Sequence, residues 1–185
     1  MNTAAKTGSS MQTKDIVLIG IFAALIAICS WISIPTAVPF TLQTFGMFMA
    51  VEMLGGKRGT LAVLVYLLLG AAGLPVFAGF TGGMGIITGS TGGYIVGFLL
   101  GALVMWAMEA LLPKHPAVSV LSMLVGLLVC YALGTAWFMF VYSRDNGAVG
   151  LMAVLGWCVF PFIIPDLIKI ALAWILSRRL RKYIY

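Results

Sequence analysis

Long apolar segments constrain this chain more than any other feature of its sequence. Residues 16–34 and 117–142 carry no charge at all, and residues 94–112 carry only Glu109. A helix that crosses the hydrocarbon core of a bilayer needs about 20 apolar residues. Of the 185 residues, 62% are hydrophobic and 9% are charged, whereas a soluble domain is about 25% charged. The sequence therefore predicts an all-α integral membrane protein whose residues 1–185 form a single membrane domain.

Prolines and glycines divide the rest of the chain into further spans. Residues 41–54 and 60–70 are apolar but short for a span, and a basic turn at residues 55–59 separates them. The last helix is expected to begin at the proline break of residues 161–165, with proline in its first turn. Residues 149–159 form a short apolar segment before that break. We therefore predict a bundle of six transmembrane helices.

Residues 71–93 differ from the spans because glycine recurs throughout them. Glycine at this density disfavours a regular helix, yet Phe77 and Phe80 are too apolar for a solvated linker. Irregular backbone at membrane depth is tolerated where it is buried in protein or lines a cavity. We therefore predict a glycine-rich loop at residues 71–93. Residues 1–12 are expected to be a polar N-terminal tail, and the apolar run from Ile16 to be a span and not a signal peptide.

The basic residues predict the orientation of the bundle. Cytoplasmic loops of membrane proteins are enriched in lysine and arginine. With six spans, nine of the eleven basic residues fall on one side: Lys6, Lys14, Lys57, Arg58, Lys114, Arg178, Arg179, Arg181 and Lys182. Both termini are therefore expected in the cytoplasm. The same asymmetry explains the net charge of +6 without a nucleic-acid partner.

Asp166 and Lys169 are the strongest candidates for a binding site. They are three residues apart, so they share one face of a helix, and charges inside a membrane segment usually face a cavity and mark a function. Near the start of the last helix, Asp166 would sit at the positive end of the helix dipole. An ionised aspartate accepts hydrogen bonds and a lysine donates them. The alternative is a structural ion pair that neutralises itself.

Catalytic, metal and cofactor sites find little support. The three cysteines lack metal-ligand spacing, and the glycine-rich loop contains no lysine and no phosphate-binding motif. The single histidine, His115, is placed in a turn, away from any nucleophile. Gln43 opens the second span, where it is either a helix cap or a ligand contact. On the first span, Ala23 and Ala27 form a small-residue pair that suits close helix packing, within the bundle or with a partner.

Several segments together resemble one family. These are PFTLQT at 39–44, GGKRG at 55–59, GLPVFA at 73–78, TGGY at 91–94, and PF at 161–162 followed by PDLIK at 165–169. In this order they resemble the BioY family, the biotin-specific substrate-binding (S) components of energy-coupling factor (ECF) transporters. Serine at position 90 stands where the family usually has proline. The stretch from Gly79 to Gly83 also lacks an asparagine or arginine for the ligand.

The resemblance implies a six-helix S-component fold in the plasma membrane of a prokaryote. It implies that biotin is captured from outside and delivered to the cytoplasm, with a transmembrane coupling (T) component and two ATP-binding-cassette ATPase subunits as partners. The implied substrate-binding residues are Asp166, Lys169, Gln43, Phe77, Ser90, Thr91, Gly92 and Tyr94. The implied contact with the coupling protein is through Ala23 and Ala27.

Other functions remain open at this point. An S component for a different vitamin would share most of these features. A membrane enzyme acting on a small lipid would need a clustered acid–base pair, and a purely structural subunit would not explain Asp166 and Lys169. The sequence therefore favours a non-enzymatic transport subunit that needs no cofactor.

Overall fold

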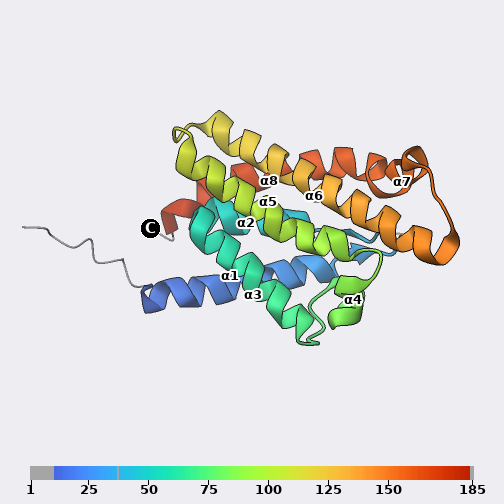
Figure 1. Ribbon diagram of the computed structural model, residues 1–185. Coiled ribbons are helices and arrows are strands. Elements are labelled where there is room, and N and C mark those ends of the chain that lie inside the picture. Colours follow the sequence, from blue (N-terminus) through green and yellow to red (C-terminus); the bar gives the residue numbers. More distant parts are fainter. Residues whose placement is uncertain (1–10, 37, 184–185) are drawn as a thin grey trace, which may run out of the picture.

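The computed structural model describes residues 11–36 and 38–183 and is almost entirely helical (Figure 1). Of the predicted polar tail, residues 1–12, only Met11 and Gln12 fall within the described residues; Lys6 lies outside them. Six longer helices form the bundle: α1 (Thr13–Trp31), α2 (Gln43–Leu54), α3 (Gly56–Ala71), α5 (Gly92–Leu111), α6 (Pro116–Asn146) and α8 (Phe160–Leu180). The shorter elements are β1 (Ser33–Ile34), β2 (Phe40–Thr41), η1 (Ala78–Phe80), α4 (Met84–Thr88), α7 (Leu151–Cys158) and η2 (Arg181–Tyr183).

Four segments within the described residues are long and apolar enough to cross a membrane. They correspond to α1, α5, α6 without its last residues, and α8 extended to Tyr183. Many of their large apolar side chains are exposed on the outside of the bundle, as expected of helices that face lipid. The structure is therefore that of a multi-pass helical membrane protein.

Helix α2 lies at the centre of this bundle. Ten of its 12 residues are buried, and it contacts α1, α3, α5, α6 and α8. Gly46 allows α1 to come close, because a Cβ at this position would lie 3.1 Å from the Cα of Ile26. Helices that are apolar on all sides are typical of buried positions. The short length of α2 is thus consistent with a core helix enclosed by longer ones.

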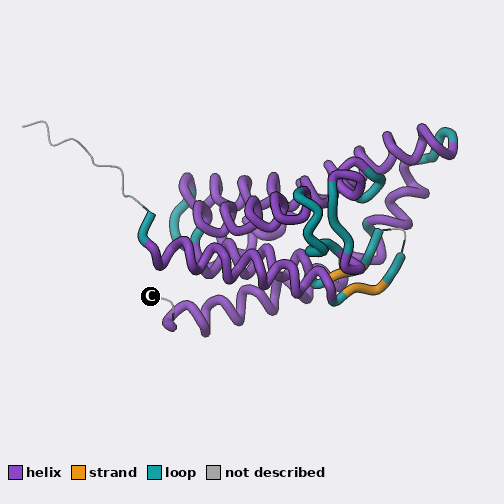
Figure 2. The backbone as a smooth tube through the Cα atoms, turned by 90° about the horizontal axis from the view of Figure 1, so that it is seen from below, coloured by secondary structure: helices purple, strands orange, loops and turns teal. Residues whose placement is uncertain are grey.

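The glycine-rich segment is irregular, as predicted. Between α3 and α5 the chain forms turns, an isolated bridge between Phe77 and Thr81, η1 and the five-residue α4. The two-stranded hairpin β1–β2, which pairs Ser33 with Thr41, was not predicted. Figure 2 shows the hairpin and the glycine-rich loop at the same end of the bundle, opposite the C-terminus.

Two predicted boundaries and the predicted position of Asp166 were wrong. The expected basic turn at residues 55–59 belongs mostly to a helix, because α3 begins at Gly56. The expected polar loop at residues 143–147 is largely helical, because α6 continues to Asn146. Helix α8 begins at Phe160 with proline in its first turn, as expected, but Asp166 then lies beyond that turn. The helix dipole acts mainly within the first turn, so it does little to stabilise this carboxylate.

Candidate functional site

Asp166 and Lys169 form a buried ion pair on α8. The Lys169 Nζ lies 2.7 Å from Asp166 Oδ1, and the two residues are only 4% and 2% exposed. Two hydroxyl groups also donate to the carboxylate: Thr44 of α2 to Oδ1 at 3.0 Å, and Tyr131 of α6 to Oδ2. The carboxylate is therefore held by three helices at once.

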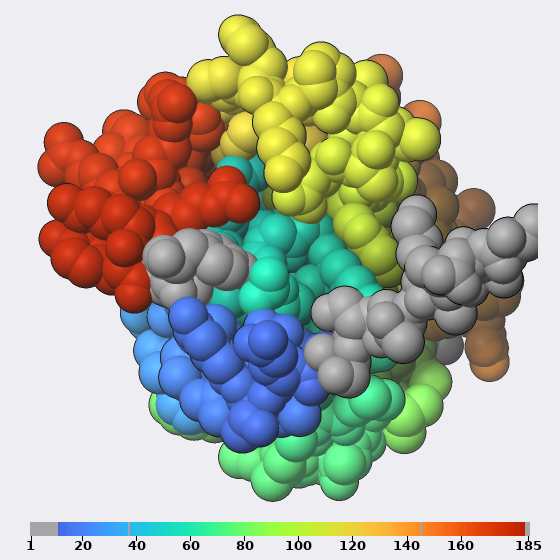
Figure 3. Space-filling model, turned by 90° about the vertical axis from the view of Figure 1, so that its left-hand side faces the viewer, coloured from blue at the N-terminus to red at the C-terminus, as the bar shows by residue number. Residues whose placement is uncertain are grey.

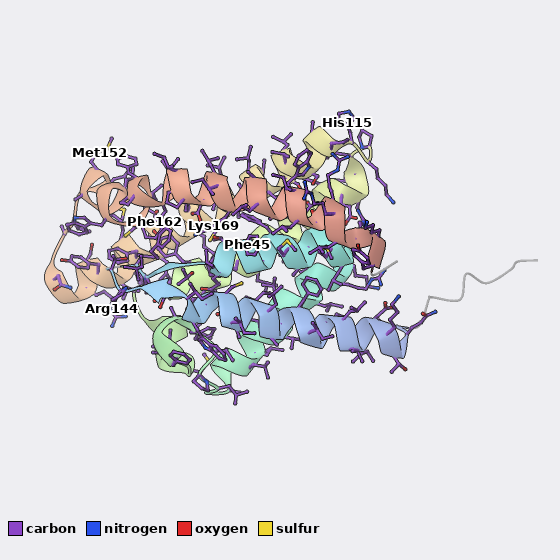
Figure 4. All side chains as sticks on the ribbon, turned by 180° about the vertical axis from the view of Figure 1, so that it is seen from behind. Phe45, His115, Arg144, Met152, Phe162 and Lys169 are labelled. Atoms are coloured by element: carbon purple, nitrogen blue, oxygen red, sulfur yellow. The ribbon has the colours of Figure 1, made fainter. Side chains whose placement is uncertain are left out.

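Lys169 has further partners on the hairpin. Its Nζ donates to the main-chain oxygen of Thr41 at 2.6 Å and lies 4.5 Å from the centroid of the Phe40 ring. Phe40 in turn stacks on Phe162 of α8, with ring centroids 5.7 Å apart. Figure 4 shows Lys169 near the middle of the bundle and Phe162 toward the end that carries Arg144. The hairpin is therefore attached to α8 by a charge and by an aromatic stack.

These contacts explain how two charges are tolerated out of water. Burying a charge is costly unless it is paired and hydrogen-bonded. An ionised carboxylate has about four acceptor sites, and Thr44, Tyr131 and Lys169 occupy three of them. The pair can present an acceptor and a donor side by side to a polar ligand. A neutral group that carries both an N–H and a carbonyl has the matching arrangement.

Gln43 and Phe77 meet through Tyr66 of α3. The Gln43 amide nitrogen donates to the Tyr66 hydroxyl at 2.9 Å, and the Tyr66 and Phe77 rings pack edge to face at 5.6 Å. Phe77 is 1% exposed. Its ring occupies the space beside Gly70, where any Cβ would overlap it. The Gln43 amide therefore lies one residue before Thr44 on α2, and through Tyr66 it is connected to the aromatic ring of Phe77.

The remaining candidates, Ser90, Thr91, Gly92 and Tyr94, lie where the glycine-rich loop enters α5. Tyr94 is buried, and its hydroxyl is 3.2 Å from the Thr135 hydroxyl on α6. Thr135 is one helical turn from Tyr131, so Tyr94 approaches the same face of α6 as the Asp166 contact.

Ser90 and Thr91 are half-buried. Among the described residues, neither has a hydrogen bond to the ion pair in the structure. Gly92 has no room for a side chain, because a Cβ there would overlap the main chain of Ile87.

Two tryptophans hold the glycine-rich loop. The Trp31 indole N–H donates to the Pro75 carbonyl at 2.8 Å, and the Trp137 indole N–H donates to the Gly89 carbonyl at 2.9 Å. Trp31 also stacks on Phe80 at 5.1 Å. Phe80 has φ of 57°, which is unusual for a bulky residue and often marks a functional constraint. The loop is therefore fastened at both ends over one end of the bundle.

Sequence reasoning missed Tyr131, Thr44, Tyr66 and Phe40 as members of this site. Phe40 and Thr44 lie within the PFTLQT segment, so the motif contained the signal. Tyr131 and Tyr66 are each a phenol within an apolar span, which needs a hydrogen-bond partner when buried. That requirement could have marked both as polar contacts, but it does not identify their partners.

The structure places Ala23 and Ala27, the residues expected to contact a coupling protein, inside the bundle. They are 2% and 5% exposed and belong to the core of the bundle. On the same helix, Gly20 and Ala24 are exposed. The small-residue pair therefore serves packing within this chain, and the neighbouring pair faces outward.

Metal binding finds no support in the part of the chain that the structure describes. It contains no group of three or more histidine, cysteine, aspartate or glutamate side chains that could hold a metal ion. Cys29, Cys130 and Cys158 are buried free thiols.

Comparison with known proteins gives a consistent result. A family model described as the BioY family matches residues 1–185. The "Biotin transporter BioY" of Thermotoga maritima is 44% identical over 170 residues, which cover 91% of this chain and 96% of that protein. The "Probable biotin transporter BioY" of Pyrococcus horikoshii is 40% identical, covering 92% and 98%. The "Biotin transporter BioY" of Rhodobacter capsulatus is 36% identical, covering 92% and 94%.

A solved structure agrees with this match. The crystal structure of the S component for biotin from an ECF-type ABC transporter superimposes with a TM-score of 0.80 and 28% identity. The alignment covers 94% of this chain and 95% of that one. The fold of the chain is therefore an ECF S-component fold.

Proposed function

This chain belongs to the BioY family, and we propose that it is the substrate-binding component of an ECF transporter and captures biotin. The observation that carries the proposal is the buried pair Asp166–Lys169, with its acceptor and donor 2.7 Å apart. Its relatives and its structural neighbour are transport proteins by name, so the chain is a transport subunit and not an enzyme.

Biotin matches this pair through its ureido ring. The ring carries N–H donors next to a carbonyl acceptor, so Asp166 accepts from an N–H group and Lys169 donates to the carbonyl. The free acceptor site on Asp166 serves this contact. The apolar part of the ligand then packs against aromatic rings such as Phe40 and Phe77. Gln43 supplies a further amide one residue from Thr44.

The carboxylate end of biotin points toward the glycine-rich loop. Ser90 and Thr91 carry hydroxyl groups there, and the glycine-rich loop also offers main-chain N–H groups, which suit an anion. Gly92, whose missing side chain leaves room for the main chain of Ile87, brings its own main chain to the ligand, and Tyr94 closes that side of the site. These four residues are thus assigned to the end of the ligand opposite the ion pair.

Ligand entry requires the hairpin and the glycine-rich loop to move. The pair is almost completely buried, and both covering segments lie at the same end of the bundle. Breaking the Trp31 contacts would free one end of the loop. These two segments therefore act as the outer lid of the site.

The bundle has six membrane helices, with both termini in the cytoplasm. Helices α2 and α3 are the two short spans, enclosed by the four longer ones. The basic residues near the start of α3, in the α5–α6 turn and after α8 lie at the C-terminal end of the bundle, and Arg144 lies at the opposite end (Figure 4). The enrichment of basic residues in cytoplasmic loops supports this orientation in the plasma membrane of a prokaryote.

The partners are a transmembrane coupling component and two ATP-binding-cassette ATPase subunits. Gly20 and Ala24, exposed on α1, provide a surface where another membrane helix can pack closely. We assign the coupling contact to this pair in place of Ala23 and Ala27. ATP hydrolysis by the partners then reorients the chain so that the site opens to the cytoplasm.

Mass spectrometry of the molecule that co-purifies with the chain tests the proposal. Biotin is the expected ligand. If a different vitamin co-purifies, the chain is still a transport subunit, but the assignment of biotin as its substrate is wrong. Co-purification of a membrane lipid in the Asp166 site, lost in Asp166→Asn, would overturn both.

A further inference from the structure

A basic recess lies at the C-terminal end of the bundle, far from the ligand site. It has a volume of about 660 Å³, and we define it by its lining residues Leu54, Gly55, Arg58, Glu109, Lys114, Arg181 and Lys182. Figure 3 views this end and shows the floor formed by residues near 55 set back between the α5–α6 turn and the end of α8. Four of these seven residues are cations, and they come from three distant segments of the sequence.

The charges of the recess do not cancel. Arg58 pairs with Asp15 of α1 at 2.5 Å, and the Glu109 carboxylate accepts from the main-chain N–H of Gly56. Counting Asp15 and Glu109 against the four cations leaves two positive charges. Arg181 and Lys114 also line a second cavity, where Glu52 lies near Arg181. Arg178 lines this cavity too, so adding Glu52 and Arg178 leaves the sum unchanged. An anionic group would therefore be attracted to Lys114, Arg181 and Lys182.

Exposed apolar side chains neighbour the recess-lining residues along the chain. Leu111 is 83% exposed and Leu180 is 39% exposed, and they lie next to the α5–α6 turn and the α8 terminus. Trp106, on α5, is also exposed, and tryptophan favours the membrane–water interface. A ligand with an anionic group and an apolar chain would thus contact the cations with the first and the apolar surface with the second.

We propose that the recess binds the phosphate headgroup of an anionic phospholipid of the cytoplasmic leaflet. Arginine binds phosphate oxygens in a bidentate manner, and lysine adds point charges. Basic pockets between membrane helices on the cytoplasmic side suit such headgroups. The recess lies at the C-terminal end of the bundle, away from the Asp166–Lys169 pair, so lipid binding there rests on the proposed orientation of the chain and not on biotin binding.

Lipid retention by the purified full-length chain tests this site. The protein is incubated in detergent with equal amounts of phosphatidylglycerol and phosphatidylcholine, and bound lipid is measured by native mass spectrometry. We expect phosphatidylglycerol to be retained preferentially. The double variant Lys114→Ala/Lys182→Ala and the variant Arg181→Gln should each lose this preference, by about fivefold for each charge removed. The matched control is Arg144→Gln, an exposed cation at the opposite end, which should retain it.

Thermal unfolding shows whether each variant is folded. This control does not require biotin binding, so failure of the biotin proposal would not affect the lipid test. Equal retention of both lipids by the wild type would overturn the proposal. So would a loss of the preference for phosphatidylglycerol in Arg144→Gln that equals the loss in the recess variants. Millimolar inorganic phosphate is added in a further arm, against chloride at the same ionic strength. Displacement of the lipid by phosphate alone would assign the recess to a free anion and overturn the lipid assignment.

Discussion

The Nζ of Lys169 lies 2.7 Å from Asp166 Oδ1, one turn apart on α8, and the same Nζ donates to the main chain of Thr41 in the hairpin. The ion pair is thus at once the polar centre of the site and the attachment point of a segment that covers it. A ligand that changes the partners of Lys169 also changes how firmly the hairpin is held. Recognition and closure are therefore physically coupled through one side chain.

Neutralising only one member of the pair should destabilise the protein. Asp166→Asn leaves Lys169 as a buried charge without its counterion, which costs about 3–5 kcal/mol. We expect a clearly lower unfolding temperature in detergent. The double variant Asp166→Asn/Lys169→Met removes both charges and should recover most of the loss. Equal stability of the single variant and the wild type would contradict the assigned pairing.

Filling the space beside Phe77 should impair the aromatic wall. In Gly70→Ala the new Cβ overlaps the Phe77 ring, so the ring must shift away from Tyr66 at a cost of about 1–3 kcal/mol. We expect weaker biotin binding by titration. Gly156→Ala in α7 is the control, because its Cβ would meet nothing within 4 Å. Equal affinity in both variants would show that Phe77 does not shape the site.

Loosening the glycine-rich loop should accelerate ligand exchange. Trp31→Phe removes the indole donor to Pro75 while an aromatic ring stays beside Phe80. Loss of one hydrogen bond, worth ~1 kcal/mol, predicts about fivefold faster dissociation of labelled biotin. Trp106→Phe, at the other end of the bundle, should leave the rate unchanged. An unchanged rate in Trp31→Phe would remove this loop contact from the exchange step.

A bulky residue on the exposed small-residue face should block assembly. Ala24→Leu projects from α1 where we place the coupling protein, so close helix approach is lost. We expect loss of co-purification with the coupling component and normal biotin binding. Ala136→Leu, on an exposed position of α6, is the matched control. Normal assembly of Ala24→Leu would place the contact elsewhere.

Much of the fold could be predicted because a membrane restricts the possible structures. Apolar length identified the long helices, and glycine density identified the irregular segment. The β1–β2 hairpin was missed, since two paired residues on each strand are too few for a periodic signal. Lys57 and Arg58 were placed in a turn, although a single glycine, Gly55 with φ of 81°, is enough to reverse the chain.

The sequence predicted individual residues of the site but not the hydrogen bonds that connect them. Charge in an apolar helix identified Asp166 and Lys169, because burying charge demands an explanation. Their partners Thr44 and Tyr131 are 122 and 35 residues away from Asp166, and helix packing alone brings them together. For Ala23 and Ala27, the small-residue pattern did not distinguish packing inside the chain from packing against a partner.

Calorimetric titration of biotin into the purified wild-type chain and into Asp166→Asn/Lys169→Met shows whether the ion pair binds the ligand. We expect the wild type to bind one biotin at nanomolar to low-micromolar affinity. We expect no measurable binding by the folded double variant. No heat with the wild type, or equal affinity in the two proteins, would contradict the assignment of this ion pair to biotin.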